Sequence, residues 1–272
     1  MNIDYEIKPP PTNKDKIKHP KLAEEGVIAK LGSSVLLIGV SKSGKSVLTH
    51  ALLSNKDFYG KAFDKLFYIS PSGDDTLDGL DIPESAKFTD LKKAAQALDA
   101  LQKHQKEQIA KHGNHKAHNF GIIMDDCVSD SKFMKSPQVL QSFIANRHYN
   151  ETVFLCSQHL NSVPKVCRLQ ATFVCVFECS SREMEVIAES FCPSGMTDKQ
   201  FETLMLDVWN SKPFQFLTIH RGVPLKERYR QGLAQVIDLD YYRSLPPNGR
   251  KPKEYKPLVS HYEDQNAKRQ KI

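Results

Sequence analysis

The residues best suited to chemistry form one stretch, Gly39-Val40-Ser41-Lys42-Ser43-Gly44-Lys45-Ser46, which matches the phosphate-loop pattern G-x-x-x-x-G-K-[ST] without a mismatch. The two glycines allow a tight turn in which consecutive backbone N–H groups point at a phosphate. Lys45 can then reach the outer phosphates, and the Ser46 hydroxyl can ligate Mg²⁺. Together with Val47, these residues predict a nucleotide-binding loop. The alternative is a glycine-rich turn that matches by chance.

A phosphate loop needs a strand before it and a helix after it, and the sequence supplies both. Residues 34–38, SVLLI, form a short apolar run that is typical of a buried strand. Residues 47–53 place apolar side chains three and four positions apart, as a helix does. A helix that begins near Lys45 adds its positive dipole end to the loop. This setting favours nucleotide binding over the chance match.

A second chemical signal is the segment 120–126, FGIIMDD, an apolar strand that ends in two acids. It has the form of a Walker B element. Asp125 then lies where a carboxylate can hold the water shell of Mg²⁺, and Asp126 where it can orient or deprotonate an attacking water. The alternative is an ordinary helix N-cap, but the phosphate loop upstream favours the catalytic interpretation.

The rest of the domain alternates predicted strands and helices. The sequence predicts strands at 64–70, 152–157, 171–179 and 214–219, helices from Thr89 or Asp90 to Lys111, at 137–146, from Ser180 or Ser181 to Ser190 and from Thr197 to Trp209, and a polar loop at 128–136. This alternation predicts an α/β fold with a mostly parallel sheet covered by helices on both faces. Such sheets bind ligands at the C-terminal ends of their strands. That rule brings the phosphate loop, the two acids and Gln158 to one edge.

The two ends of the chain differ in composition from this domain. The 272 residues carry a net charge of +6, and residues 243–272 hold eight Lys/Arg against three Asp/Glu. We therefore expect an extended arm at 1–25, a P-loop ATPase domain at 26–220 and a basic extension at 221–272. Basic ends can neutralise DNA phosphates or serve as solubilising tails. The final run Lys268-Arg269-Gln270-Lys271 is a DNA contact or a nuclear localisation-like signal.

Composition excludes or disfavours several classes of protein. No run approaches the ~18 apolar residues of a membrane span, and residues 1–22 lack the apolar centre of a secretory signal. The six cysteines form no C-x-x-C pair and lie mostly in apolar runs. This pattern favours reduced, buried thiols in an intracellular protein over disulfides or zinc.

Taken in this order, the motifs resemble those of the FtsK–HerA superfamily of P-loop ATPases. Within it, the chain is most similar to the poxvirus-like genome-packaging ATPases of large double-stranded DNA viruses and their smaller relatives. Four blocks carry the resemblance over roughly residues 30–220: GVSKSGKS at 39–46, IIMDD at 122–126, NRHYN at 146–150 and SQHLNSVPKVCR at 157–168. Many superfamily members have Glu as the second acid, whereas the viral subgroup tolerates the shorter Asp126.

The resemblance implies an ASCE, RecA-like fold and ATP hydrolysis, with Mg²⁺, coupled to translocation of double-stranded DNA into a capsid. It further implies a homo-oligomeric ring of five or six copies, capsid vertex proteins as partners, and action at viral assembly sites in the host cell or in the virion. Gln158 matches the sensor of the γ-phosphate, and Arg147 resembles the finger given to the next subunit's ATP, with Arg168 as the alternative. Lys132 and Lys135 are candidates for DNA contacts, or belong to a plain surface loop.

Three other functions stay open at this point. A small-molecule kinase needs an arginine lid, for which residues 221–230 supply Arg221, Arg228 and Arg230, but it leaves the paired acids and Gln158 unexplained. A regulatory GTPase needs N-K-x-D, and the spacing is wrong at both Asn13-Lys14-Asp15 and Asn55-Lys56-Asp57. A third alternative is another FtsK–HerA DNA motor that is not dedicated to packaging.

Overall fold

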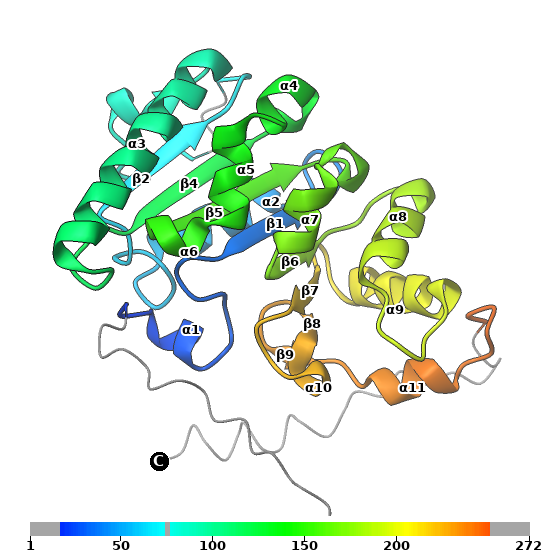
Figure 1. Ribbon diagram of the computed structural model, residues 1–272. Coiled ribbons are helices and arrows are strands. Elements are labelled where there is room, and N and C mark those ends of the chain that lie inside the picture. The colour runs from blue at the N-terminus through cyan, green and yellow to red at the C-terminus, as the bar shows by residue number, and fades with distance from the viewer. Residues whose placement is uncertain (1–16, 74–76, 251–272) are drawn as a thin grey trace, which may run out of the picture.

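The centre of the protein is a nine-stranded sheet, seen in a computed structural model that describes residues 17–73 and 77–250 (Figure 1). The strand order within these residues is β3-β2-β4-β5-β1-β6-β7-β8-β9. The strands are β1 (Ser34–Ile38), β2 (Lys65–Ile69), β3 (Lys87–Phe88), β4 (Phe120–Asp125), β5 (Glu151–Ser157), β6 (Phe173–Val176), β7 (Leu217–His220), β8 (Tyr229–Gln231) and β9 (Gln235–Val236). The first six strands in this order, from β3 to β6, are parallel to their neighbours. The last three, β7, β8 and β9, pair antiparallel.

The strand that leads into the phosphate loop lies in the middle of the sheet. Leu36 of β1 pairs with Leu155 of β5 on one side and with Val174 of β6 on the other, and all five residues of β1 are buried. Strand β5 lies between β1 and β4, so an extra strand separates the phosphate loop from the two acids. The continuous apolar runs of the central strands are explained by this burial on both faces.

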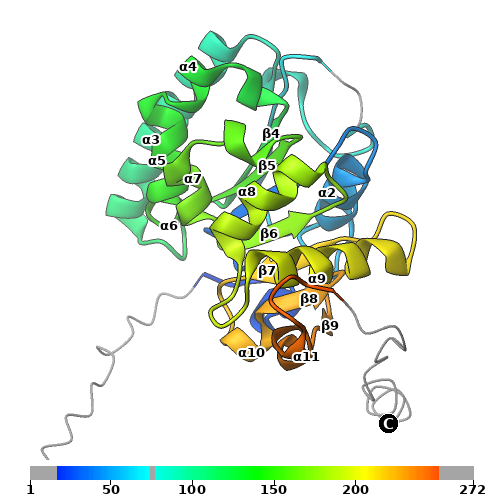
Figure 2. The ribbon, with the colours of Figure 1, turned by 90° about the vertical axis from the view of Figure 1, so that its right-hand side faces the viewer.

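Helices cover both faces of the sheet, as the sequence predicts. Figures 1 and 2 show α3, α5, α6 and α7 on one face and α2 on the other, with α8 and α9 beside the antiparallel end. Their bounds are α2 (Lys45–Ser54), α3 (Leu91–His112), α5 (Pro137–Ile144), α6 (Asn146–Tyr149), α7 (Lys165–Gln170), α8 (Ser181–Phe191) and α9 (Asp198–Ser211). Short 3-10 turns lie at Glu84–Ala86, Cys127–Ser129 and Leu160–Ser162.

Side-chain caps explain why these helices begin where the sequence predicts. Asp90 accepts hydrogen bonds from the backbone N–H groups of Lys92 and Lys93 at the start of α3. Ser180 caps α8 in the same way, and Thr197 forms a reciprocal capping box with Gln200 at the start of α9. Each cap satisfies N–H groups that have no partner within the first turn of the helix.

The prediction that residues beyond 221 form only a basic extension is wrong for residues 225–245. These residues form α10 (Leu225–Arg228), β8, β9 and α11 (Leu239–Ser244), and they add two strands to the sheet. Tyr229, Leu239 and Tyr242 are buried in the core. The aromatic and leucine side chains of this segment are scattered among prolines and charged residues without a clear period, so the sequence does not predict that they are buried. The run Lys268-Arg269-Gln270-Lys271 lies outside the described residues.

The arm predicted at 1–25 is described from residue 17 onward. Residues Lys21–Glu24 form a short helix, α1, and Ala23 is buried in the core. Helix α1 therefore packs with the domain, and the arm ends before residue 21 and not at residue 25. Residues 1–16 lie outside the described part of the chain.

Two smaller predictions also need correction. The segment 128–136 is not an open loop, because it contains a helix, α4 (Ser131–Met134), whose N-cap is Asp130 and whose Phe133 is buried. Both lysines of this segment are exposed, Lys132 within the helix and Lys135 after it. Strand β7 begins at Leu217, three residues later than the sequence predicts. Phe214 has a φ of 58°, which is incompatible with an extended strand.

The prediction of free, mostly buried cysteines is confirmed. All six are free, and Cys127, Cys156, Cys167 and Cys175 are buried. Within residues 17–73 and 77–250, no helix has the length and apolar character needed to span a bilayer.

A buried carboxyl makes the stability of the fold depend on pH. Glu151 opens β5 and is fully buried, and burial raises its pKa from 4.5 to about 7, an effect that Ser142 and Gln102 partly offset. The folded protein therefore holds this proton more tightly than the unfolded chain. We expect the free energy of unfolding to fall by about 3 kcal/mol as pH rises from about 4.5 through about 7.

Glu151→Gln tests this expectation, because the amide has the same shape and does not ionise. The variant should have a higher unfolding midpoint in urea than the wild type at pH 8, and the gap should close at pH 5. Equal midpoints at pH 8 would contradict the assignment of the pH dependence to Glu151.

Candidate nucleotide-binding site

The turn between β1 and α2 has the tight geometry that a phosphate loop requires. Gly44 adopts a φ of 106°, which side chains rarely tolerate. Gly39 is required for space, because a Cβ at this position would lie 2.6 Å from the Cβ of Phe177 and 2.8 Å from Ser43 Oγ. The loop is fixed at its base by hydrogen bonds from Gly39 N to Ser157 O and from Val40 N to Glu178 O, each 3.2 Å.

Lys45 projects into the hollow that the loop encloses. Its side-chain ammonium donates hydrogen bonds to Gly39 O at 2.7 Å and to Val40 O at 2.8 Å, and the side chain is buried. Burial lowers the pKa of Lys45, while Cys156 and the carboxylates of Asp126 and Asp125 counteract that shift. A buried cation whose partners are neutral carbonyl oxygens is well placed to exchange them for phosphate oxygens. The loop therefore fits the phosphates of a nucleoside triphosphate.

The predicted magnesium ligands lie at the same edge of the sheet. Asp125 is the last residue of β4 and pairs with Cys156 of β5, two residues before Gln158. Ser46 lies in the first turn of α2 and is half-buried. One hydroxyl and one carboxylate are the kind of sparse oxygen set with which Mg²⁺ keeps several waters and binds substrate phosphates. The residues present thus fit Mg²⁺ held by Ser46, Asp125 and a bound triphosphate.

The second acid and the predicted sensor are brought together. Gln158 Nε2 lies 3.4 Å from Asp126 Oδ2, and Gln158 immediately follows β5. Asp126 has a φ of 51°, which turns the chain sharply at the end of β4. The segment after Gln158 is anchored by Glu183, which accepts a hydrogen bond from Leu160 N at 2.9 Å and lies 3.3 Å from His159 Nδ1. Residues 39–46, 125–126 and 158 therefore meet at one edge, as predicted.

The two finger candidates lie at the other edge of the sheet. Arg147 belongs to α6, which precedes the first residue of β5, and a Cβ on Gly32 would lie 3.3 Å from its Cγ. Gly32 precedes β1, whereas the phosphate loop follows β1, so Arg147 is remote from its own loop. Arg147 is exposed and has no ion pair in the part of the chain that the structure describes.

Arg168 is less available than Arg147. It lies near the end of α7, is half-buried, and its Nε is buried without a hydrogen-bond partner among the described residues. Its carbonyl accepts a hydrogen bond from Arg221 Nη1 at 3.4 Å. Neither arginine can serve the nucleotide of its own subunit if that nucleotide lies on the phosphate loop.

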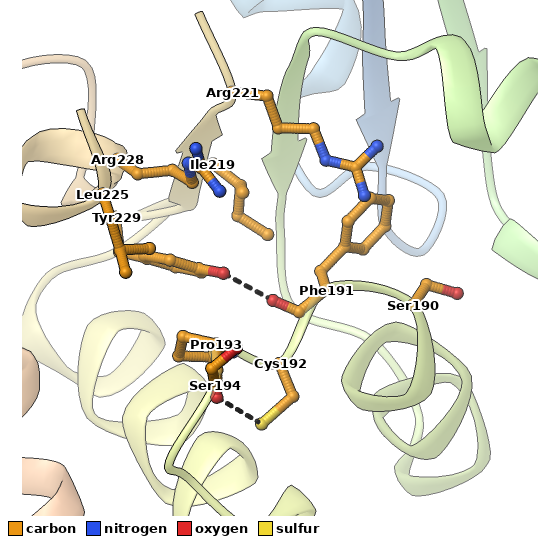
Figure 3. A pocket seen from close by; sticks show the side chains of 10 residues that line it. All are labelled: Ser190, Phe191, Cys192, Pro193, Ser194, Ile219, Arg221, Leu225, Arg228 and Tyr229. Carbon is orange, nitrogen blue, oxygen red and sulfur yellow. Dashed lines mark hydrogen bonds between the residues drawn. The ribbon is translucent and has the colours of Figure 1, made fainter. Parts of the chain in front are cut away.

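Arginines 221, 228 and 230 do not form a lid over the phosphate loop. Arg230 is buried and donates hydrogen bonds to the carbonyls of Gly26, Glu227 and Leu233. Figure 3 shows Arg221 and Arg228 at a separate pocket of about 300 Å³ beside the end of β7. That end of β7 pairs with the beginning of β6, at the edge opposite the phosphate loop. The kinase alternative thus loses the lid that suggested it.

Sequence reasoning missed Phe177 and Glu178 as supports of the loop. Both follow β6, and they contact the loop through the Phe177 ring, which would lie 3.4 Å from a Cβ at Gly44, and through the Glu178 carbonyl. A backbone carbonyl leaves no signal in the amino-acid sequence. The apolar run that ends at Phe177 gave the only local indication, and it indicated a strand.

Comparison with known proteins agrees with this geometry. The crystal structure of B204, the DNA-packaging ATPase from Sulfolobus turreted icosahedral virus, is similar with a TM-score of 0.51 and 16% identity, covering 75% of this chain and 98% of that chain. EssC (ATPases 2 and 3) from Geobacillus thermodenitrificans is similar with a TM-score of 0.54 and 12% identity, and the match covers 87% of this chain and 49% of that chain. The third similar structure is EccC (ATPases 2 and 3) from Thermomonospora curvata, in complex with a signal sequence peptide. Its TM-score is 0.50 at 11% identity, and the match covers 76% of this chain and 37% of that chain.

At these identities the structural likeness establishes the fold, which is that of a P-loop ATPase. No curated protein sequence matches the chain significantly. The family model described as Poxvirus A32 protein matches residues 27–217, a range that exceeds half of the chain and contains the phosphate loop, the two acids, Arg147 and Gln158. The protein therefore belongs to the poxvirus A32 protein family.

Proposed function

We propose that this protein is an ATP-driven translocase of double-stranded DNA that packages a viral genome into its capsid. One observation carries the enzymatic part: Lys45, Asp125, Asp126 and Gln158 converge at a single edge of the sheet. Membership of the poxvirus A32 protein family and the likeness to the fold of a DNA-packaging ATPase support the packaging role. The place of action that follows is the site of virion assembly in the host cell.

In the proposed mechanism, each residue at this edge of the sheet has its own role in ATP hydrolysis. Lys45 exchanges its loop carbonyls for the outer phosphates and neutralises charge as the γ-phosphoryl group leaves. Mg²⁺, when bound by Ser46 and Asp125, supplies further positive charge to the phosphates. Asp126 orients the attacking water and accepts its proton, and Gln158, 3.4 Å away, holds Asp126 and senses the γ-phosphate.

The site is completed by a second copy of the chain. The ammonium of Lys45 donates hydrogen bonds to two carbonyls of its own loop, and Arg147 is exposed at the opposite edge. A head-to-tail arrangement of identical subunits brings these two edges together and closes into a ring. In the ring that we propose, Arg147 of one subunit stabilises the leaving γ-phosphoryl group on its neighbour. Arg168 is the second choice because it is half-buried.

The lysines after the two acids are proposed to contact DNA. Lys132 and Lys135 are exposed on and after α4, which follows the catalytic acids by only a few residues. Contacts to phosphates bind without reading sequence. Replacing both by Ala should reduce DNA affinity and lower the slope of log affinity against log salt by about 2.

The matched control for this prediction is Lys106→Ala with Lys111→Ala, which removes two exposed lysines of α3. Affinity for a duplex without sequence preference is measured by fluorescence anisotropy at several salt concentrations. An unchanged salt slope in the Lys132 and Lys135 variant would place the DNA contacts elsewhere.

The proposed function is tested by measuring ATP hydrolysis with and without linear duplex DNA. We expect duplex DNA to increase the rate, because a translocase couples its cycle to the polymer that it moves. A hydrolysis rate that no form of DNA changes would contradict the motor, and phosphate transfer to a nucleoside or sugar would favour a kinase.

A further inference from the structure

The arrangement of the site fixes which way a nucleotide lies on the loop. The groups that act on the γ-phosphate, Asp126 and Gln158, directly follow β4 and β5, which lie on one side of β1. An extended nucleotide with its last phosphate on that side has its base on the other side of β1, over β6 and β7. The residues exposed there are the candidates for contact with the base.

Phe214 is the large aromatic side chain at that position. It precedes β7, whose first residue, Leu217, pairs with Val176 at the edge of the sheet where the phosphate loop lies. Its Cβ would lie 3.8 Å from a Cβ at Gly44, so it stands directly beside the loop. Phe214 is nevertheless 73% exposed, in the same neighbourhood as Val47 at 74% and Val40 at 44%.

The backbone of Phe214 is held in a conformation that bulky residues avoid. Its φ is 58°, in the left-handed region, where a large aromatic residue is a genuine outlier. Strain of this kind persists where the surroundings impose it, and it gathers at ligand sites. Two residues later, Phe216 packs against Phe177 with ring centroids 4.9 Å apart, and this contact anchors the segment to the end of β6. The ring of Phe214 is thus presented to solvent by a supported, strained turn.

We propose that Phe214 is the platform on which the base of the bound nucleotide stacks. This inference rests on the proposed function, because it concerns the same nucleotide site. Stacking on one aromatic face accepts any base but favours the larger ring system, so it selects purine over pyrimidine nucleoside triphosphates and discriminates little between adenine and guanine. Val47 and Val40 would contact the edge of the base or the sugar.

The test compares ATP with inorganic tripolyphosphate, which has the phosphates but no base. Phe214→Ala should raise the Kd for ATP about tenfold or more and leave the Kd for tripolyphosphate unchanged. Phe214→Trp should restore ATP affinity, and its added fluorescence should be quenched by ATP and not by tripolyphosphate. Leu225→Ala, which removes an exposed apolar side chain of α10 at the pocket opposite the phosphate loop, is the control and should change neither Kd.

Phe214→Gly adds a readout that a purely structural role would not give. Glycine accepts the positive φ, so the variant should unfold at a higher temperature than the wild type while it binds ATP more weakly. Loss of stability together with loss of affinity for both ligands would make Phe214 a support of the loop and overturn the inference. An unchanged ATP affinity with altered oligomeric state would make it a subunit contact and overturn it as well. Failure of the wild type to bind either ligand would instead contradict the proposed function.

Discussion

Lys45→Ala is expected to abolish ATP hydrolysis, with a fall in rate of about a thousandfold or more. The ammonium is buried in the loop, where it donates hydrogen bonds to the carbonyls of Gly39 and Val40. In a site of low dielectric constant, a positive charge directed at the outer phosphates acts on the charge that develops in the transition state. Alanine removes that charge, and the other lysine of the loop, Lys42, is exposed to solvent.

The matched control is Lys56→Ala, which removes an exposed lysine just after α2. Steady-state release of phosphate is measured for both variants, with circular dichroism to establish that each is folded. A folded Lys45→Ala protein that retains more than about a tenth of the wild-type rate would contradict the role of this loop in hydrolysis.

Arg147→Ala is expected to lower kcat by about a thousandfold or more, with little change in ATP affinity. Arg147 lies at the edge of the sheet opposite the phosphate loop, so in the proposed ring it would act on the nucleotide of a neighbouring subunit. It contributes to the transition state and not to ground-state binding, and for that reason kcat falls while the Kd for ATP stays. Arg250→Ala, which removes an exposed arginine after α11, is the control.

Mixed oligomers separate action between subunits from action within one subunit. Lys45→Ala subunits retain Arg147, and Arg147→Ala subunits retain the phosphate loop. A mixture therefore forms some interfaces at which an intact finger meets an intact loop. Hydrolysis should reappear in the mixture, with a maximum at an intermediate ratio. Absence of recovery at every ratio would indicate that Arg147 acts within its own chain or has no catalytic role.

The nucleotide site was predictable from the sequence because its signals are local. Eight consecutive residues specify the turn of the phosphate loop, and the acids follow directly on a buried strand. The rule that ligands bind at the C-terminal ends of parallel strands then brings Gln158 to Asp126, 32 residues away in sequence, with a distance of 3.4 Å. Caps such as Asp90 and Thr197 are equally local, and both begin helices in the structure.

The rest of the molecule depends on contacts that no local pattern records. Strands β8 and β9 are three and two residues long, too short for an alternating pattern to be recognised. Helix α4 is a single turn, stabilised by the cap at Asp130 and by burial of Phe133. The alternating aromatics around Phe214 predict a strand, whereas its φ of 58° lies in the left-handed region, and no local pattern indicates this.

The central claim, that ATP hydrolysis moves this protein along duplex DNA, is tested most directly by displacement of a third strand from a DNA triplex. The account predicts that the wild-type protein releases the labelled third strand in the presence of ATP and Mg²⁺, and that the Lys45→Ala variant does not. Hydrolysis of ATP by the wild type on the same DNA without release of the third strand would contradict it.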